Sequence, residues 1–271
     1  MPEGSEDSTC IIQTADRKEV TPLPPIERIR SSKLPADEFE RRLMELKTKY
    51  ESGDTASVAF TDTCFRRFLI GRKDCVKDAF DALRKFAHWR IETKADLVTF
   101  ESGGIFLKNR VSFIHEYDKH GRPVVYSLVG RHDANHRNIE EIKNAITYTN
   151  DSLLRLARPE EEKVVGIFDL SAFTLRCMDF EATKHMFEVL QNFYPEVLGQ
   201  LLVVNAPTIF SVCWSIIRVW LDPDTAKKVI FVSLAQVRDY VDEDKISPEL
   251  GLSLAGLADF KAATEAEQSA I

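Results

Sequence analysis

The chain has 271 residues and a mass of 30.9 kDa, enough to bury one large hydrophobic core or two coupled ones. With 44% hydrophobic and 29% charged side chains, it is not disordered throughout. The net charge of −7 excludes the overall positive field expected of a nucleic-acid-binding protein. Taken as a whole-chain sum, it also argues against a membrane partner.

The cysteines and the N-terminal residues predict the compartment. The five cysteines are odd in number, widely spaced and without a CxxC motif, which argues against a disulfide framework and against a thiolate zinc site. The first thirty residues contain acidic side chains and no apolar run, so they predict neither a signal peptide nor a transit peptide. We therefore expect reduced thiols and a cytoplasmic protein.

The net charge conceals an uneven distribution along the chain. Residues 64–94 hold nine bases and four acids, whereas residues 235–271 hold three bases and eight acids. A solvated helix face is the default interpretation of the basic segment. Local charge is nevertheless a better guide to a binding surface than the sum over the chain.

The first part of the chain is expected to be helical. Residues 1–33 are rich in proline towards their end and lack periodicity, which predicts an irregular N-terminal arm. Apolar residues at helical spacing then predict three helices, over residues 37–50, 63–70 and 74–90. We expect residues 34–104 to form a small antiparallel bundle.

Beyond residue 105, β-prone runs alternate with helical patterns. Two runs flank a turn in which Gly121 is free to adopt a positive φ, and they predict a hairpin. The expected strands are 111–117, 123–129, 164–168, 201–204 and 229–232, and the expected helices are 138–157, one capped by Asp179, and 208–220. This alternation predicts an α/β domain with a largely parallel sheet over residues 105–256, followed by an acidic tail over 257–271.

The helix expected over residues 208–220 is apolar on every side. No charged residue occurs between Glu196 and Arg218. Pro207 divides this stretch into a strand and a helix of about four turns, which is too short to cross a membrane. The helix is either buried between the sheet and its neighbours, or it covers a lipid-filled cavity and faces acyl chains or bilayer in turn. Its two tryptophans favour the second interpretation slightly, since indoles suit a membrane interface.

Several motifs occur in a characteristic order between residues 34 and 256. They are Arg67-Phe68-Leu69 with Arg72-Lys73, His88-Trp89-Arg90, the element from Asp118 to Val124, Tyr194-Pro195-Glu196, Asn205-Ala206-Pro207, and Leu221-Asp222-Pro223 with Lys228. In this order and spacing they resemble the motifs of the CRAL-TRIO family of lipid-transfer proteins, especially its phosphatidylinositol-transfer branch. One motif alone is a weak signal, but the ordered set is specific.

The resemblance implies a helical N-terminal region joined to a lipid-binding domain, with a hydrophobic pocket floored by the sheet and closed by a mobile gate, the helix over residues 208–220. The pocket and gate residues are then Ile209, Phe210, Cys213, Trp214, Ile217, Val164 and Gly166. The headgroup of phosphatidylinositol is expected beside Lys73, Glu196, Thr225 and Lys228, together with the adjacent Arg72 and Asp222. Lys228 and Thr225 can donate to phosphate oxygens. Glu196 can accept from ring hydroxyls or orient Lys73.

The sequence departs from the phosphatidylcholine-exchanging relatives at one strand. Those proteins share Ser and Thr on the pocket strand that ends in an acidic residue. This chain has Val164 and Gly166 at the corresponding positions. Without these hydroxyls, binding of a choline lipid is not expected. Phosphatidylinositol is the favoured ligand, and a sterol-like or other apolar molecule is the candidate second ligand.

The sequence contains no motif typical of an enzyme. It has no GxSxG, P-loop, GxGxxG or HExxH, which removes the esterase, kinase, dehydrogenase and zinc-protease classes. His132 and His136 stand four residues apart, but their loop-like surroundings favour solvated histidines over a metal site. No catalytic residue, metal or cofactor is expected apart from the phospholipid ligand.

The favoured function is therefore that of a non-enzymatic, cytoplasmic lipid carrier that touches membranes transiently. In that mechanism the helix over residues 208–220 opens at a membrane, an acyl chain enters the pocket, and the helix closes again. The alternative is a regulatory or scaffold module in which the pocket only senses lipid. A phosphoinositide kinase is the candidate protein partner, and nucleic acid is not expected to be one.

Overall fold

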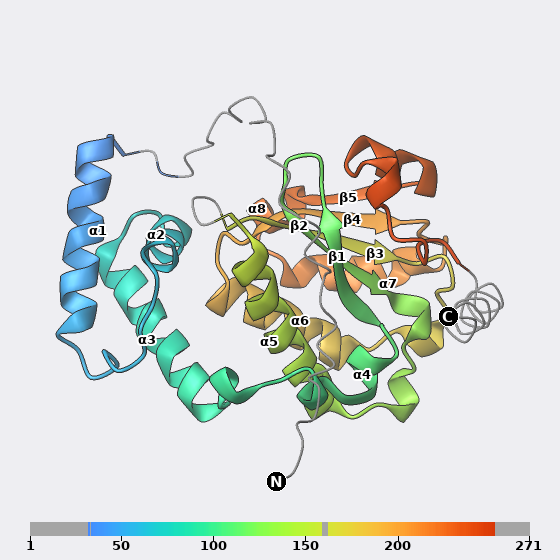
Figure 1. The fold of residues 1–271 in the computed structure, drawn as a ribbon, viewed down its shortest axis with the longest axis horizontal. Helices are drawn as coiled ribbons and strands as arrows, with labels where there is room; N and C mark the ends of the chain where they lie inside the picture. The colour runs from blue at the N-terminus through green and yellow to red at the C-terminus, as the bar shows by residue number, and fades with distance from the viewer. Residues whose placement is uncertain (1–31, 33, 159–161, 253–271) are drawn as a thin grey trace, which may run out of the picture. The chain divides into compact units, whose positions relative to one another are not determined.

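A computed structural model describes residue 32, residues 34–158 and residues 162–252 (Figure 1). The irregular arm expected over residues 1–33 therefore lies outside the described residues apart from Ser32. The acidic tail expected over residues 257–271 also lies outside them.

Three helices form the first part of the described chain. They are α1 (Ala36–Glu51), α2 (Asp62–Gly71) and α3 (Val76–Glu92), within two residues of the expected bounds. Their apolar stripes meet in one core that includes Leu46, Phe68 and Leu83, each of them fully buried. The third helix begins at Val76 rather than at residue 74 because Lys73 and Asp74 adopt left-handed backbone conformations with φ of 52° and 61°.

Short turns connect this region to the sheet. Two 3-10 turns, Ala95–Leu97 and Glu101–Gly103, lead into the five-residue helix α4 (Gly104–Lys108). Helix α4 could not be predicted from the sequence, because one and a half helical turns are too few to establish a periodicity. The connection ends where the first strand begins.

Five strands form a single sheet in the spatial order β1-β2-β3-β4-β5. They are β1 (Ser112–Tyr117), β2 (Pro123–Leu128), β3 (Val164–Asp169), β4 (Leu198–Val204) and β5 (Val229–Val232). The first pair is an antiparallel hairpin in which Gly121 has φ of 74°, and the other three pairs are parallel. The expectation of a largely parallel sheet is confirmed.

The two faces of the sheet are covered differently. Helices α5 (Ile139–Leu156), α6 (Phe180–Phe193) and α7 (Phe210–Ile217) pack on the face that carries Phe168 and Leu201 (Figure 1). The C-terminal segment covers the opposite face, where Val237, Val241 and Leu250 pack on the side chains that alternate with these. Because β3, β4 and β5 are parallel, their amino-terminal ends lie along the same side of the sheet, which is called its amino-terminal edge.

Helix α7 is shorter than the sequence predicts. Its α-helical part ends at Ile217 and continues as a 3-10 turn over Arg218–Trp220, whereas a four-turn helix over residues 208–220 was expected. Within the α-helical part, the hydroxyls of Ser211 and Ser215 donate to the carbonyls of Thr208 and Val212, three residues back. A further short helix, α8 (Pro223–Lys227), follows directly and was not predicted.

Candidate functional site

An apolar cavity lies between the sheet and helices α6 and α7. It contains about 530 Å³ of empty space, part of which is open solvent. Its floor consists of Phe168, Leu201 and Val203 on β3 and β4, and Phe187 and Thr183 of α6 close one side. The remaining lining residues are Val129, Leu170, Phe173, Cys177, Met178, Phe210, Trp214 and Ile217. A cavity with this lining suits a hydrocarbon chain or ring and offers one hydroxyl, that of Thr183.

Helix α7 forms one wall of the cavity, and its side facing the cavity and its side facing solvent are both apolar. Phe210, Trp214 and Ile217 recur at helical spacing and face the cavity. Of the other expected gate residues, Cys213 is buried in the adjoining core without lining the cavity, and Ile209 is 48% exposed. The structure thus brings three of the five expected gate residues to the cavity.

The outer face of this helix carries an exposed apolar stripe. Ile209, Val212, Ile216 and Val219 are spaced three or four residues apart, and Val212 and Val219 are 64% and 78% exposed. The interpretation of the helix as buried on every side is therefore wrong. An apolar stripe that faces solvent is a common feature of surfaces that contact a membrane or another protein.

Val164 and Gly166 of β3, which were expected in the pocket, are not among the residues that line the cavity. Val164 packs in a separate core with Leu153, Val189 and Tyr194, near the amino end of the strand, so it does not line the cavity. Gly166 is on the same face, and a Cβ atom there would lie 2.8 Å from Cδ1 of Leu201. A larger residue at this position would therefore require the Leu201 side chain to shift.

The first half of the expected headgroup site consists of two turns in contact. Gly71, at the end of α2, lies against the turn that precedes β4: a Cβ atom at Gly71 would lie 2.9 Å from Cβ of Pro195. The same Cβ atom would lie 3.9 Å from Cγ of Glu196, so the chain that continues into Arg72 and Lys73 starts beside Glu196. Arg72 is half-buried and Lys73 is exposed, so their cationic groups are available to a ligand.

The carboxylate of Glu196 has a partner that the sequence did not suggest. Lys163, which directly precedes β3, approaches Oε2 of Glu196 to 3.2 Å and also donates to its backbone carbonyl. The expectation that Glu196 orients Lys73 is therefore not met, because Lys163 takes that place. This ion pair joins residues 33 positions apart, which only the pairing of β3 with β4 brings together.

The second half of the expected headgroup site is built around the start of α8. Asp222 caps this helix: its Oδ1 accepts from the amides of Asp224 and Thr225, both at 2.9 Å, and its Oδ2 accepts from the Thr225 hydroxyl at 2.5 Å. Burial alone raises the pKa of Asp222, but these hydrogen bonds outweigh it, so the pKa lies below its ordinary value. Lys228 follows the helix, and its carbonyl accepts from the amide of Leu201 on β4.

The two halves share one edge of the sheet. Lys163, Glu196 and Lys228 precede β3, β4 and β5, so they lie towards the amino-terminal edge of these parallel strands. Within the described residues, no hydrogen bond or ion pair joins Glu196 to Thr225 or Lys228. Glu196 precedes Leu201 by five residues, so at most about 16 Å of chain separates the charged edge from the cavity floor.

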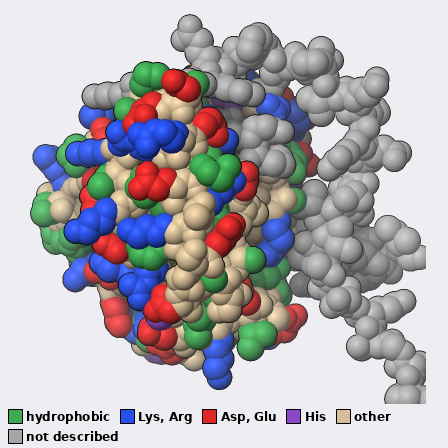
Figure 2. Space-filling view, turned by 90° about the vertical axis from the view of Figure 1, so that its left-hand side faces the viewer, with side chains coloured by type: hydrophobic (Ala, Val, Ile, Leu, Met, Phe, Trp, Pro, Cys, Tyr) green, Lys and Arg blue, Asp and Glu red, His purple; other side chains and the backbone are tan. Residues whose placement is uncertain are grey.

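Within the described residues, four of the nine bases over residues 64–94, all of them arginines, form ion pairs with acids from outside the segment. Arg66 pairs with Glu40 at 2.7 Å, and Arg84 pairs with Asp54 at 2.8 Å. Figure 2 accordingly shows basic and acidic side chains interspersed on this side of the molecule rather than a patch of one sign. The solvated helix face is therefore the better interpretation for most of the segment, whereas Arg72 and Lys73 directly follow Gly71, which contacts the turn of Pro195 and Glu196.

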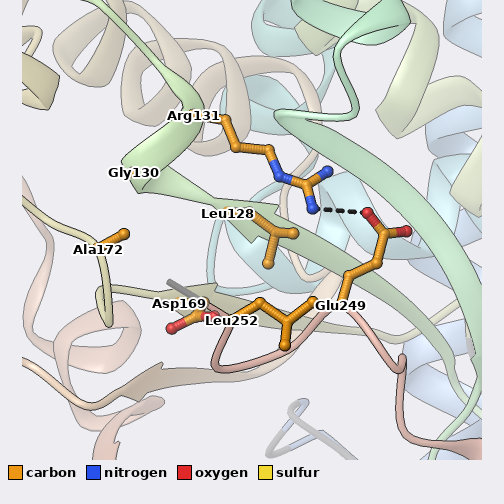
Figure 3. A pocket seen from close by; sticks show the side chains of 7 residues that line it. All are labelled: Leu128, Gly130, Arg131, Asp169, Ala172, Glu249 and Leu252. Carbon is orange, nitrogen blue, oxygen red and sulfur yellow. Dashed lines mark hydrogen bonds and ion pairs between the residues drawn. The ribbon is translucent and has the colours of Figure 1, made fainter. Parts of the chain in front are cut away.

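A second, smaller recess lies at the opposite, carboxyl-terminal edge of the sheet (Figure 3). Arg131 points across it towards Glu249, with Nη2 and Oε2 2.6 Å apart, and Arg110 approaches Oε1 of the same carboxylate. Burial alone raises the pKa of Glu249, but hydrogen bonds from the two arginines outweigh it and lower the pKa. Asp169, at the end of β3, accepts from the amide of Gly251 at 2.7 Å. These contacts attach the C-terminal segment to the sheet.

The two histidines singled out in the sequence each face a carboxylate. Nε2 of His132 lies 3.2 Å from Asp179, the residue that caps α6, and Nδ1 of His136 lies 3.1 Å from Asp133. In the ranges that the structure describes, no group of three or more His, Cys, Asp and Glu is arranged to hold a metal ion. Cys64, Cys75, Cys177 and Cys213 are all free thiols. No described helix is both long enough and apolar enough to span a bilayer.

Comparison with known proteins agrees with this geometry. The model of the CRAL/TRIO domain matches residues 107–251. A CRAL-TRIO domain-containing protein of Schizosaccharomyces pombe is 32% identical over 220 residues, which cover 73% of this chain and 61% of that protein. The phosphatidylinositol transfer protein CSR1 of Eremothecium gossypii is 29% identical over 206 residues, 71% of this chain and 47% of that protein. This chain thus spans about half the length of these curated relatives.

A solved structure has the same fold. The crystal structure of Sfh5 superposes with a TM-score of 0.59 and 15% sequence identity, over 86% of this chain and 99% of that one. At this identity the likeness concerns the fold alone.

Proposed function

Because this chain belongs to the CRAL/TRIO domain family, whose members bind and transfer lipids, we propose that it is a carrier of phosphatidylinositol. In this proposal the acyl chains occupy the cavity under α7, and the inositol headgroup lies at the amino-terminal edge of the sheet. The carrier works without catalysis, in the cytoplasm, and touches membranes only while it loads and unloads.

One observation carries the proposal: the cavity wall formed by α7 is apolar on its inner and on its outer face. Phe210 and Trp214 face the cavity, while Val212 and Ile216 face solvent. A helix with both properties can exchange its inner contacts for acyl chains and its outer contacts for the hydrocarbon of a bilayer. We propose that α7 swings outward at a membrane and closes over the bound lipid.

The distances along β4 suit a phospholipid. The hydrocarbon core of a bilayer is about 30 Å thick, so one acyl chain extends about 15 Å. The chain from Glu196 to Leu201 spans at most about 16 Å, which does not exceed the reach of one acyl chain. A headgroup held near Glu196 can therefore send an acyl chain onto the cavity floor.

The residues at the sheet edge support an inositol phosphodiester as the headgroup. Lys73, Arg72 and Lys228 supply positive charge for the phosphate, and Glu196 supplies an acceptor for ring hydroxyls. Thr225, oriented by Asp222, adds a hydroxyl. Phosphatidylcholine is disfavoured because Val164 and Gly166 offer no hydroxyl on β3.

The proposal is tested by identifying the bound lipid and by measuring its transfer. Native mass spectrometry of protein purified from a cell extract is expected to find phosphatidylinositol, and its consistent absence would contradict the assignment. The double variant Glu196→Ala with Lys228→Ala is expected to abolish transfer of phosphatidylinositol between vesicles while the protein stays folded. A sterol-like ligand, or lipid that binds but is never transferred, would instead support the alternative carrier or the lipid-sensing module.

A further inference from the structure

Lys163 is a charged residue at the candidate headgroup site that neither the motifs nor the resemblance singled out. Its ammonium lies 3.2 Å from Oε2 of Glu196 and donates to the carbonyl of the same residue. The side chains of Lys163 and Glu196 are 22% and 26% exposed, so solvent screens this pair only partly. One cation thus contacts both the side chain and the backbone of Glu196.

The neighbouring residue contacts the same turn through an arginine. Glu162 pairs with Arg67 of α2 at 2.5 Å, with both side chains almost completely buried. Nη1 of Arg67 also lies 3.4 Å from the carbonyl of Pro195. Two consecutive residues at the start of β3 therefore hold two consecutive residues of the turn before β4.

The backbone here adopts a conformation that needs such support. Glu196 has φ of 61°, in the left-handed region that residues with a Cβ atom rarely occupy. Glu162, Lys73 and Asp74 have φ of 50°, 52° and 61°. Such residues keep this conformation only where surrounding contacts impose it, and they concentrate at functional sites.

The pairing also determines which charges a ligand meets. With Lys163 bound to Glu196, the carboxylate is neutralised by a residue behind the turn. Among the residues the structure describes, the ammonium of Lys73 has neither a hydrogen bond nor an ion pair, and it lies on the turn next to Glu196. Without Lys163, Glu196 would be free to pair with Lys73, and each would then be withdrawn from the ligand.

We propose that Lys163 is a positioning residue for headgroup recognition. It holds Glu196 in place to accept hydrogen bonds from inositol hydroxyls and leaves Lys73 to bind the phosphate. This inference rests on the proposed function, since it concerns the same site and the same lipid. It adds that recognition depends on a lysine that acts through Glu196 rather than by touching the lipid.

The test uses the full chain and transfer of phosphatidylinositol between vesicles. Lys163→Met removes the charge and keeps the length of the side chain. It is expected to reduce transfer at least about tenfold, as for the loss of a charge-assisted hydrogen bond. Lys163→Arg restores a cation and is expected to recover most of the transfer. Lys184→Met, which removes a lysine from an exposed pair with Glu188, is the matched control and is expected to have no effect.

A double-mutant cycle separates positioning from a general structural role. If Lys163 acts through Glu196, then Lys163→Met changes transfer less than about twofold in a Glu196→Gln background. Thermal unfolding of each variant is recorded in parallel. If Lys163→Met does not fold, Lys163→Gln, which keeps a donor for the carbonyl of Glu196, takes its place in the same cycle.

The outcomes are distinct. If the wild type transfers phosphatidylinositol and the Lys163→Met variant transfers it equally fast, the role of Lys163 is overturned and the proposed function stands. The role is also overturned if the fold-reduction in transfer of the double variant equals the product of the two single reductions, since Lys163 would then act independently of Glu196. Wild-type protein that transfers no phosphatidylinositol overturns the proposed function and this inference together.

Discussion

Gly71 and Pro195 approach each other so closely that the helical region and the lipid-binding domain meet without a side chain between them. A Cβ atom at Gly71 would lie 2.9 Å from Cβ of Pro195, closer than such atoms pack in proteins. The turn after Gly71 carries Arg72 and Lys73, and the turn after Pro195 begins with Glu196. The geometry of the candidate headgroup site thus depends on a glycine that itself binds nothing.

We expect Gly71→Ala to weaken both the fold and lipid transfer. The added methyl group must displace the Pro195 turn, and overpacking of this kind costs about 1–3 kcal/mol. Alanine recovers roughly 0.5–1 kcal/mol through its better helix propensity, so a net loss of about 1–2 kcal/mol is expected in urea unfolding. In a Pro195→Gly background, which removes the opposing Cβ, the same change should cost less. A stabilised Gly71→Ala protein would show that the two turns are not in contact.

The exposed stripe on α7 is expected to matter for membranes and not for stability. Val212→Ser with Ile216→Ser removes apolar area from the solvent-facing side, so the free energy of unfolding should change by less than about 0.5 kcal/mol per site. Sedimentation with vesicles and the rate of lipid transfer should both fall several-fold, because less apolar surface can enter the bilayer.

The control for this variant is Leu97→Ser, which removes a side chain that is 73% exposed but lies far from α7 in sequence, in a turn before the sheet. It should bind vesicles as the wild type does. Equal losses in both proteins would mean that general surface hydrophobicity, and not α7, drives membrane contact.

The elements of this fold were predictable because their signals are local. Helical and alternating apolar patterns located all five strands and the longer helices, and Gly121 and Asp179 marked a turn and a helix start that the structure contains. Helix α8 was missed although Asp222 followed by Pro223 is a strong start signal, because its five residues are too few for a periodicity.

The contacts within the candidate site were not predictable, because they join residues far apart in the chain. Lys163 and Glu196 meet only through the pairing of β3 with β4. The positive net charge of residues 64–94 did not predict a basic binding surface correctly for the same reason, since Arg66 pairs with Glu40 and Arg67 pairs with Glu162. The net charge of a sequence window does not include the acids that folding brings next to its bases.

Asp222→Ala is expected to reduce transfer through loss of order at the start of α8. The change removes the cap, which costs about 0.5–2 kcal/mol, and releases the Thr225 hydroxyl from the carboxylate. Transfer of phosphatidylinositol should fall several-fold, whereas Asp222→Asn, which keeps an acceptor for the amides, should retain more of it. Asp224→Ala is the control, since this carboxylate is exposed and pairs with Lys227, three residues further along the same short helix. Equal losses at both positions would contradict a role for the cap.

Glu249 is expected to make stability depend on pH in the acid range. Its pKa is lowered in the folded protein because Arg110 and Arg131 donate to the carboxylate, despite the opposing effect of burial. A group with a lowered folded pKa stabilises the protein above its unfolded pKa, and this contribution is lost as the pH falls through the folded pKa. Glu249→Gln should therefore lower the free energy of unfolding at pH 7 by roughly 3 kcal/mol, the scale for removing one partner of a buried pair.

The difference between the wild type and Glu249→Gln should stay constant from pH 7 to about pH 5 and shrink below about pH 4.5, where the carboxylate becomes protonated in the unfolded chain. Urea unfolding at a series of pH values measures it directly. Glu243→Gln is the comparison, because that carboxylate is 79% exposed and stands 3.9 Å from Arg238, so it should change stability little at any pH. A constant difference down to pH 3 would mean that the charge of Glu249 does not hold the C-terminal segment on the sheet.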